Sequence, residues 1–258
     1  MRAPCIVILG LGQGVGLACA HRFVDAKWSV VIVDANHEVL NRAEKDMGDS
    51  CVYLHEDQFT RLGLKNALAG TLEQCDGVDF VLSIPPIPEA GELNEMTAEA
   101  LTTLYRKSSV SSLLAAQTFS KEMIREIAEE GEQVERLPNG KGFLHILSRA
   151  ALAGDPDHIA ASLSQGALLS VMKSLALEFA PHSIRSNALV AVRPRSEKTE
   201  PWLKHRTPLG RSARPSEIAE AAFFLTAPES RFITGQTIEI DGGRSVLNGI
   251  YKYDELLK

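Results

Sequence analysis

Cysteine and aromatic residues are scarce in this chain of 258 residues, which has four cysteines and 6% aromatic residues. The cysteines are widely spaced, with no CxxC pair and no clustered histidines, at Cys5, Cys19, Cys51 and Cys75. This spacing argues against a disulfide framework and gives no support to a metal centre. We therefore expect reduced thiols and a cytoplasmic location.

Long apolar runs and an excess of basic charge are also missing. No stretch approaches the roughly eighteen apolar residues of a membrane-spanning helix, and the N-terminus has no signal-peptide pattern. The formal net charge of −6 argues against nucleic acid or an anionic membrane as the main partner. Hydrophobic residues make up 45% of the chain, so we expect a soluble globular protein with a substantial core.

Short runs rich in Val, Ile and Leu alternate with longer stretches of helical periodicity, as in Ile159–Ala180 and Pro215–Thr226. The runs show little polar alternation, as expected for strands buried on both faces of a parallel sheet. They predict an α/β fold, a single Rossmann-type doubly wound domain over 1–258 with a short tail at 245–258. Its seven parallel strands, with helices on both faces, are predicted at Cys5–Leu9, Ser29–Val33, Cys51–Leu54, Val78–Ile84, Gly142–Leu147, Ser186–Val192 and Thr237–Ile240.

Two segments lack this regular pattern and are predicted to be loops. Glu129–Lys141 is charged and ends near a Pro-Asn-Gly turn sequence, which is typical of a surface connection. Arg193–Pro208 is polar and contains three prolines, and we expect it to lie over one end of the sheet. Neither segment divides the chain into separate domains.

A glycine-rich segment, Gly10–Gly16, follows the first predicted strand and opens a helical pattern. Glycines suit this place because the turn is tight and the backbone must approach a pyrophosphate closely. The helix N-terminus then offers N–H groups and a positive dipole end to the phosphates. The alternative is a sharp strand–helix turn with no ligand.

The second predicted strand ends at Asp34, where a carboxylate can accept hydrogen bonds from both adenosine ribose hydroxyls. The same carboxylate would repel a 2′-phosphate, and no arginine lies beside it in the sequence. We therefore predict that NAD(H) is preferred over NADP(H). The alternative is that Asp34 is only a solvated loop residue.

The spacing of Gly10, Gly14 and Gly16, GxxxGxG, resembles that of the short-chain dehydrogenase/reductase family. The closing helix and last strand, with Ile233–Gln236 and Asp241–Gly243, resemble the same family. The resemblance extends from about Ile6 to Arg244 and implies an oxidoreductase fold that binds a dinucleotide. The cofactor-binding set that it implies is Gly10, Gln13, Gly14, Val15, Gly16, Asp34, Asp57, Ser83 and Gln165.

The resemblance also implies catalytic positions, and most of them are altered in this chain. Ala161 stands at the family's tyrosine position, Gln165 at its lysine position and Ser108 at about its asparagine position. Only Ser148 keeps the family's residue. Alanine has no proton to exchange, and an uncharged glutamine can hydrogen-bond ribose hydroxyls but cannot lower the pKa of a neighbouring phenol.

Other groups could supply the missing proton. His158 lies shortly before Ala161 and could act as an acid or base, or could be a capping or surface residue. The tail could present Tyr251 or Tyr253, whereas Tyr53 and Tyr105 lie far from the expected place in the sequence. Ser148 could bind a ligand or simply end its strand.

Two further polar residues near Ser148 are weaker candidates for the site. Arg149 could bind an anion, but we expect it to point away from Ser148 because side chains alternate along a strand. His145 lies inside an apolar strand and is expected to be a core residue.

Three functions therefore stay open. The first is an NAD(H)-binding protein without the usual alcohol–carbonyl hydride transfer, a pseudoenzyme of this family. The second is an active oxidoreductase with a rewired proton donor. The third is a structural subunit without cofactor. Because helices corresponding to the one around Ser108–Ser112 pack between subunits in this family, the resemblance also implies a homodimer or homotetramer.

Overall fold

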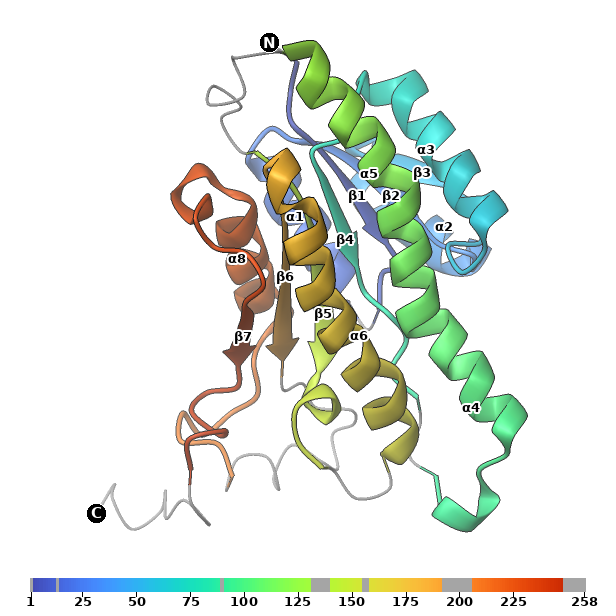
Figure 1. The fold of residues 1–258 in the computed structure, drawn as a ribbon, viewed down its shortest axis with the longest axis vertical. Coiled ribbons are helices and arrows are strands. Elements are labelled where there is room, and N and C mark those ends of the chain that lie inside the picture. The colour runs from blue at the N-terminus through green and yellow to red at the C-terminus, as the bar shows by residue number, and fades with distance from the viewer. Residues whose placement is uncertain are drawn as a thin grey trace.

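The computed structural model describes residues 2–12, 14–88, 91–130, 140–154, 158–191 and 206–247. Seven strands form one parallel sheet in the order β3-β2-β1-β4-β5-β6-β7 (Figure 1). The order reverses between β1 and β4, so the chain winds in both directions from the first strand. The strands are β1 (Cys5–Leu9), β2 (Ser29–Val33), β3 (Val52–Leu54), β4 (Phe80–Ser83), β5 (Lys141–Ser148), β6 (Ile184–Ala191) and β7 (Thr237–Ile240).

The predicted sheet is confirmed, and the differences concern strand ends. The predicted strand Val78–Ile84 is shorter in the structure, because the N–H of Val78 donates to the Glu126 carboxylate at 2.9 Å instead of pairing with a strand. β5 and β6 are longer than predicted: β5 includes the polar ends Lys141 and Ser148, and β6 begins at Ile184.

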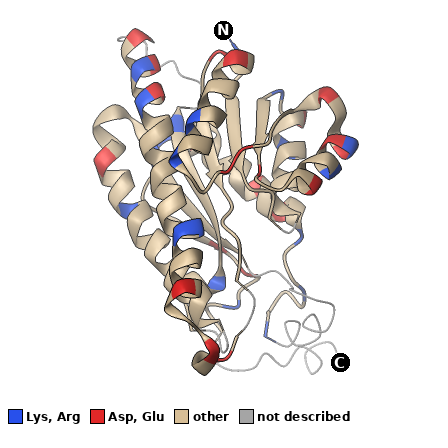
Figure 2. Cartoon of the chain, turned by 90° about the vertical axis from the view of Figure 1, so that its right-hand side faces the viewer, with Lys and Arg blue, Asp and Glu red and all other residues tan. Residues whose placement is uncertain are grey.

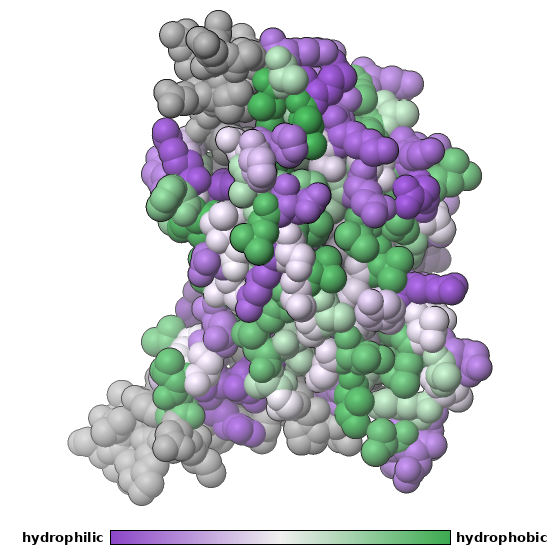
Figure 3. Space-filling model, viewed as in Figure 1, coloured by the Kyte–Doolittle hydropathy of each residue, from purple (hydrophilic) through white to green (hydrophobic). Residues whose placement is uncertain are grey.

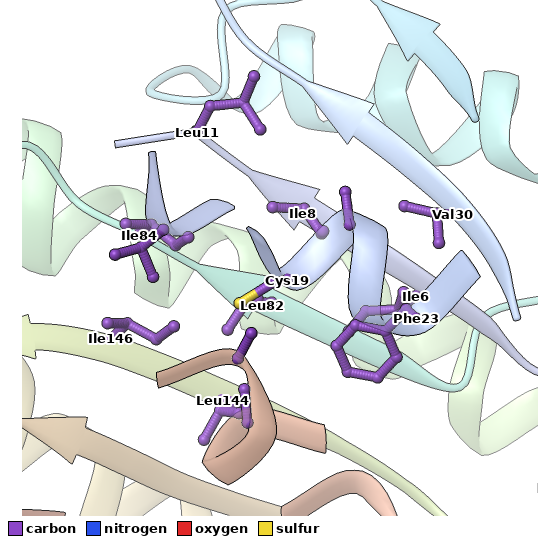
Figure 4. Packing of buried hydrophobic residues seen from close by; sticks show 14 of the residues in the cluster. Ile6, Ile8, Leu11, Cys19, Phe23, Val30, Leu82, Ile84, Leu144 and Ile146 are labelled. Atoms are coloured by element: carbon purple, nitrogen blue, oxygen red, sulfur yellow. The ribbon is translucent and has the colours of Figure 1, made fainter. Parts of the chain in front are cut away.

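Helices cover both faces of the sheet, and two large core clusters lie between the helices and the sheet, with a smaller third cluster around Leu147, Leu168 and Val190. One core cluster lies under α1 (Val15–Asp25), α2 (His37–Met47) and α8 (Pro215–Thr226). The other lies under α3 (Arg61–Cys75), α5 (Ser111–Glu130) and α6 (Ile159–Phe179). Figure 4 shows the first cluster, in which Cys19 of α1 lies beside Leu82 of β4.

The helical spacing of apolar residues in Ile159–Ala180 predicted α6 and placed Leu163 on its apolar face. Leu163 is instead 48% exposed, whereas the polar residues Ser164 and Gln165 are buried. By length and composition, Ile159–His182 is apolar enough to cross a membrane, but half of it is buried inside the protein. Core packing against the sheet accounts for this apolar character.

The serine-rich segment Ser108–Ser112 overlaps a π-helical turn, Arg106–Val110, between α4 (Ala98–Tyr105) and α5. The hydroxyls of Ser108 and Ser109 donate to the backbone carbonyl of Ser164 in α6, at 3.2 and 2.5 Å. Small side chains allow this close approach of two helices. These serines therefore pack within the chain rather than on its outer surface.

The amino edge of the sheet holds a buried charge cluster of Arg2, Asp79, Glu126 and Lys141. The Lys141 ammonium is fully buried and lies 2.7 Å from Glu126 and 3.1 Å from Asp79. Arg2 pairs with the same two carboxylates at 2.6 and 2.8 Å. Two cations thus neutralise two anions at the end of the sheet away from the glycine loop.

Candidate functional site

The glycine loop lies at the carboxyl edge of the sheet, between β1 and α1. Gly10 has a φ of 83° and donates to the carbonyl of Val33 at 2.9 Å, which ties the loop to the end of β2. A Cβ on Gly16 would lie 2.6 Å from the Leu11 Cα, so only glycine fits there. Gly14 is the N-cap of α1 with a φ of 84°, and Val15 begins the helix with a buried side chain. Gln13 lies outside the described residues.

Asp34 is held beside this loop by two backbone amides. Its Oδ2 accepts the N–H of Leu11 at 3.2 Å, and its Oδ1 accepts the N–H of Asn36 at 2.9 Å. A carboxylate has about four lone-pair sites, so each oxygen keeps capacity for a further donor. The structure therefore brings the glycine loop and the carboxylate together, as the sequence predicted.

Gln58, which sequence reasoning missed, is buried directly after the turn that follows β3. Its Oε1 accepts the N–H of Ala35 at 2.8 Å, so it joins the ends of β2 and β3. Gln58 lies four residues after the end of β3, among the polar residues that follow this strand, and only its position near the carboxyl edge distinguishes it in the sequence. Gln58 lines a pocket with the predicted residue Ser83 and with Leu9, Phe59, Ile84, Pro85, Ser111 and Ser112.

Asp57 is exposed, and its carboxylate accepts the N–H of Phe59 at 3.0 Å. Its backbone carbonyl accepts the N–H of Thr60, and α3 begins directly after that residue. Gly63 packs so closely that a Cβ there would lie 2.2 Å from the Asp57 carbonyl oxygen. Asp57 thus fixes the turn after β3 at the rim of the pocket.

The other half of the carboxyl edge is built from β5, α6 and the loop after β4. The Gln165 carbonyl accepts both the N–H and the hydroxyl of Ser148, at 2.7 and 2.8 Å. Its amide nitrogen donates to the carbonyl of Pro86 at 3.3 Å. The Gln165 side chain is fully buried, so the two predicted residues meet each other rather than an open surface.

His158, Tyr53 and Tyr105 are the alternative proton donors that the structure describes. His158 is the N-cap residue of α6, but its side chain makes no capping hydrogen bond, and Ala161 is fully buried one turn later. Tyr53 donates to the carbonyl of Gly48 at 2.9 Å, before β3 begins, and Tyr105 is 38% exposed on α4. The tail tyrosines lie outside the described residues, as do residues 193–205 of the predicted loop.

Arg149 and His145 do not add acid–base chemistry to this edge. Arg149 begins a short 3₁₀ turn after β5, where its Nε is buried. Burial lowers the pKa of His145 to about 4, and neither ring nitrogen has a hydrogen-bond partner within the described ranges. The prediction that His145 is a core residue is confirmed by its burial, but the expectation that its ring would be hydrogen-bonded there is wrong for the described part of the chain. The residues that the structure describes contain no group of His, Cys, Asp or Glu that could hold a metal ion.

The fold and the glycine loop together define a Rossmann-type α/β protein, and comparisons with known proteins identify its family. A family model described as enoyl-(acyl carrier protein) reductase matches residues 10–245. The chain belongs to this family of short-chain dehydrogenase/reductase oxidoreductases.

Individual relatives are similar over nearly their whole length. The chain is 27% identical to galactitol 2-dehydrogenase (L-tagatose-forming) of Cereibacter sphaeroides, over 94% of this chain and 95% of the relative. It is 28% identical to 2,5-dichloro-2,5-cyclohexadiene-1,4-diol dehydrogenase of Sphingobium indicum, over 92% and 95%. The crystal structure of 3-ketoacyl-(acyl-carrier-protein) reductase from Brucella melitensis, complexed with NADH, superposes with a TM-score of 0.84. Its sequence identity is 26%, over 95% of this chain and 99% of that one.

Proposed function

We propose that this chain is an NAD(H)-binding member of its family that does not carry out the usual alcohol–carbonyl hydride transfer. The observation that carries the proposal is the contrast between the two halves of the carboxyl edge. Asp34 and the glycine loop form a coherent adenosine and pyrophosphate site. Ala161 and Gln165 stand where the family's tyrosine and lysine would act, and both are buried.

The half of the carboxyl edge that contains the glycine loop and Asp34, the adenosine half, has a geometry that fits a dinucleotide. Gly10 and Gly16 let the loop backbone pack closely against Ile84 and Leu11, whereas a Cβ on Gly14 would meet nothing within 4 Å, so a phosphate can approach the backbone at the start of α1. The Asp34 carboxylate suits ribose hydroxyls and would repel a 2′-phosphate, which supports the preference for NAD(H) over NADP(H). When bound, the nicotinamide ring can accept or give a hydride.

The half that contains Ser148 and Gln165, the nicotinamide half, does not offer the acid or base that hydride transfer to a carbonyl requires. An alanine methyl cannot donate or accept a proton, and the Gln165 amide carries no charge that would stabilise a phenolate. The Ser148 hydroxyl, the one family residue that is kept, donates its proton to Gln165. Positioned acid–base catalysis contributes roughly a hundred- to ten-thousand-fold in rate, so its loss leaves binding intact but removes most turnover.

Calorimetric titration with NAD, NADH and NADPH tests the proposal, combined with absorbance of the reduced nicotinamide in the presence of a carbonyl panel. We expect NADH to bind more tightly than NADPH, with no oxidation of NADH above the uncatalysed rate. Absence of binding would overturn the proposal and favour the structural-subunit alternative.

An oxidoreductase with a rewired proton donor is the second candidate, and it is favoured by the names of the relatives, two of which are dehydrogenases. His158 begins the helix that carries Ala161 and is the residue to test. Turnover that disappears in His158→Ala, while NADH affinity is unchanged, would establish this candidate in place of the first.

We further propose that the chain forms a homodimer or homotetramer through the outer face of α6. Leu163 and Leu177 are exposed on this helix, at 48% and 79%. Figure 3 shows apolar and weakly polar residues along this face. Light scattering should give a dimer or tetramer mass that Leu163→Glu reduces, whereas Leu62→Glu on α3 should not. A monomeric mass for the unmodified chain would overturn the proposal.

The free thiols and the distribution of charge indicate where the protein is located and which partners it has. Cys5, Cys19, Cys51 and Cys75 are free thiols, which supports a reducing, cytoplasmic environment. Figure 2 shows acidic and basic residues interspersed along the helices in this view, and the chain has a formal net charge of −6. We therefore propose a dinucleotide and an additional small molecule as ligands, and neither nucleic acid nor a membrane as partner.

A further inference from the structure

The carboxyl edge has two halves that differ in how much hydrogen-bonding capacity they leave for a ligand. The adenosine half comprises the glycine loop, Asp34 and Gln58, at the ends of β1, β2 and β3. The nicotinamide half comprises Ser148, Gln165 and Pro86, from β5, α6 and the loop after β4. In the first half the side chains keep hydrogen-bonding capacity for a ligand, whereas in the second the Gln165 side chain is engaged by Ser148 and by the Pro86 carbonyl.

In the adenosine half, the backbone fixes each polar side chain and leaves capacity on it. Asp34 accepts one amide on each carboxylate oxygen, from Leu11 and from Asn36. Gln58 is fixed by the amide of Ala35 and lines the adjoining pocket. The amides therefore hold the carboxylate in place while its remaining lone pairs stay available to ribose hydroxyls.

In the nicotinamide half, the Gln165 side chain is engaged within the protein by the Ser148 hydroxyl and by two backbone groups. Both lone pairs of the Gln165 carbonyl are engaged, by the N–H and the hydroxyl of Ser148. One of the two amide hydrogens of Gln165 is directed to Pro86, and the whole side chain is fully buried. Turning this amide toward a ligand would leave the Ser148 N–H buried without its acceptor, which is unfavourable.

We propose that this site recognises the ADP-ribose part of its ligand and gains no affinity from nicotinamide, so that an adenosine diphosphate compound without that ring binds as well as NAD(H). In this arrangement Gln165 is a positioning residue that joins β5, α6 and the loop after β4. The inference rests on the proposed dinucleotide site and specifies which part of the ligand that site selects.

Calorimetry on the unmodified full chain tests the inference with NAD, NADH, ADP-ribose and nicotinamide mononucleotide. We expect the Kd of ADP-ribose to lie within about threefold of the Kd values for NAD and NADH, and nicotinamide mononucleotide not to bind. A larger preference for either dinucleotide over ADP-ribose overturns the inference but leaves the proposed function standing. If neither dinucleotide nor ADP-ribose binds, the proposed function itself fails.

Two variants distinguish the contribution of the nicotinamide half to ligand binding from that of the adenosine half. Gln165→Met keeps the side-chain volume and removes the amide; we expect unchanged ratios between NAD and ADP-ribose, and a lower melting temperature. Asp34→Asn should weaken both ligands by the same factor. A Gln165→Met chain that loses affinity for NAD but not for ADP-ribose would show that Gln165 contacts the nicotinamide ribose, against the inference. Should this variant not fold, the comparison on the unmodified chain still decides.

Discussion

The hydroxyl of Ser148 donates to the side-chain carbonyl of Gln165 at 2.8 Å, and the backbone N–H of Ser148 donates to the same oxygen at 2.7 Å. In the assignment proposed above, Ser148 is the catalytic residue type kept from the family and Gln165 replaces its lysine, and these two residues are hydrogen-bonded to each other. This pairing turns a position expected to contact a ligand into a buried link between β5 and α6.

Gln165→Lys alone should not create hydride-transfer activity, because Ala161 still provides no proton. The buried ammonium would also replace an acceptor of two hydrogen bonds, so we expect a loss of roughly 2–4 kcal/mol in the free energy of unfolding. Denaturant unfolding and NADH absorbance with a carbonyl panel check the two expectations. Turnover in this single variant would mean that another residue already supplies the proton.

Asp34→Arg should weaken NAD binding by about tenfold or more, because a guanidinium cannot accept ribose hydroxyls and leaves the Leu11 and Asn36 amides without their acceptor. The relative affinity for NADPH should rise, since the new cation suits a 2′-phosphate. Asp49→Arg is the matched control, with the same charge change on an exposed residue before β3. Unchanged NAD affinity in Asp34→Arg would show that the adenosine site is placed wrongly.

His145 should make the fold sensitive to mild acid. Its pKa is about 4 in the folded chain because of burial, against an ordinary value of 6.5. Between pH 6.5 and about pH 4, His145 is protonated in the unfolded chain but stays neutral in the folded chain. The stability contributed by the neutral imidazole is therefore present above pH 6.5 and lost as the pH falls toward 4, by up to roughly 3 kcal/mol.

The comparison that isolates this effect is urea unfolding of the unmodified chain and His145→Leu between pH 7 and pH 4. The variant should lose less stability over that range, because leucine does not titrate. Parallel curves for the two chains would contradict the assignment of this acid sensitivity to His145.

Lys141→Ala should destabilise the fold by roughly 3–5 kcal/mol, because it leaves the Asp79 and Glu126 carboxylates buried with Arg2 as their only cation among the described residues. The effect should appear in the midpoint of denaturant unfolding. Lys121→Ala, at an exposed position of α5, serves as the control and should change the midpoint little. A small effect of Lys141→Ala would mean that water solvates the two carboxylates.

The alternation of apolar runs and helical periods was enough to predict the seven parallel strands and the helices on both sides. The glycine loop and Asp34 were also predictable, because a tight turn, a helix start and a carboxylate after the next strand are all local in the sequence. Pro215–Thr226 was predicted to the residue, since its proline start and its apolar period agree.

The tertiary structure alone decided how the polar side chains are used. Gln165 contacts Ser148 and Pro86, Gln58 contacts Ala35, and Ser108 contacts Ser164; each pair joins segments distant in the sequence. Periodicity reports which face of an element is apolar, but the direction of an amide or a hydroxyl depends on the donors and acceptors that other strands and helices bring to it. The sequence thus determined the order of strands and helices, the glycine loop and the place of Asp34 after β2, and the packing of β5 against α6 decided that Gln165 is engaged within the protein.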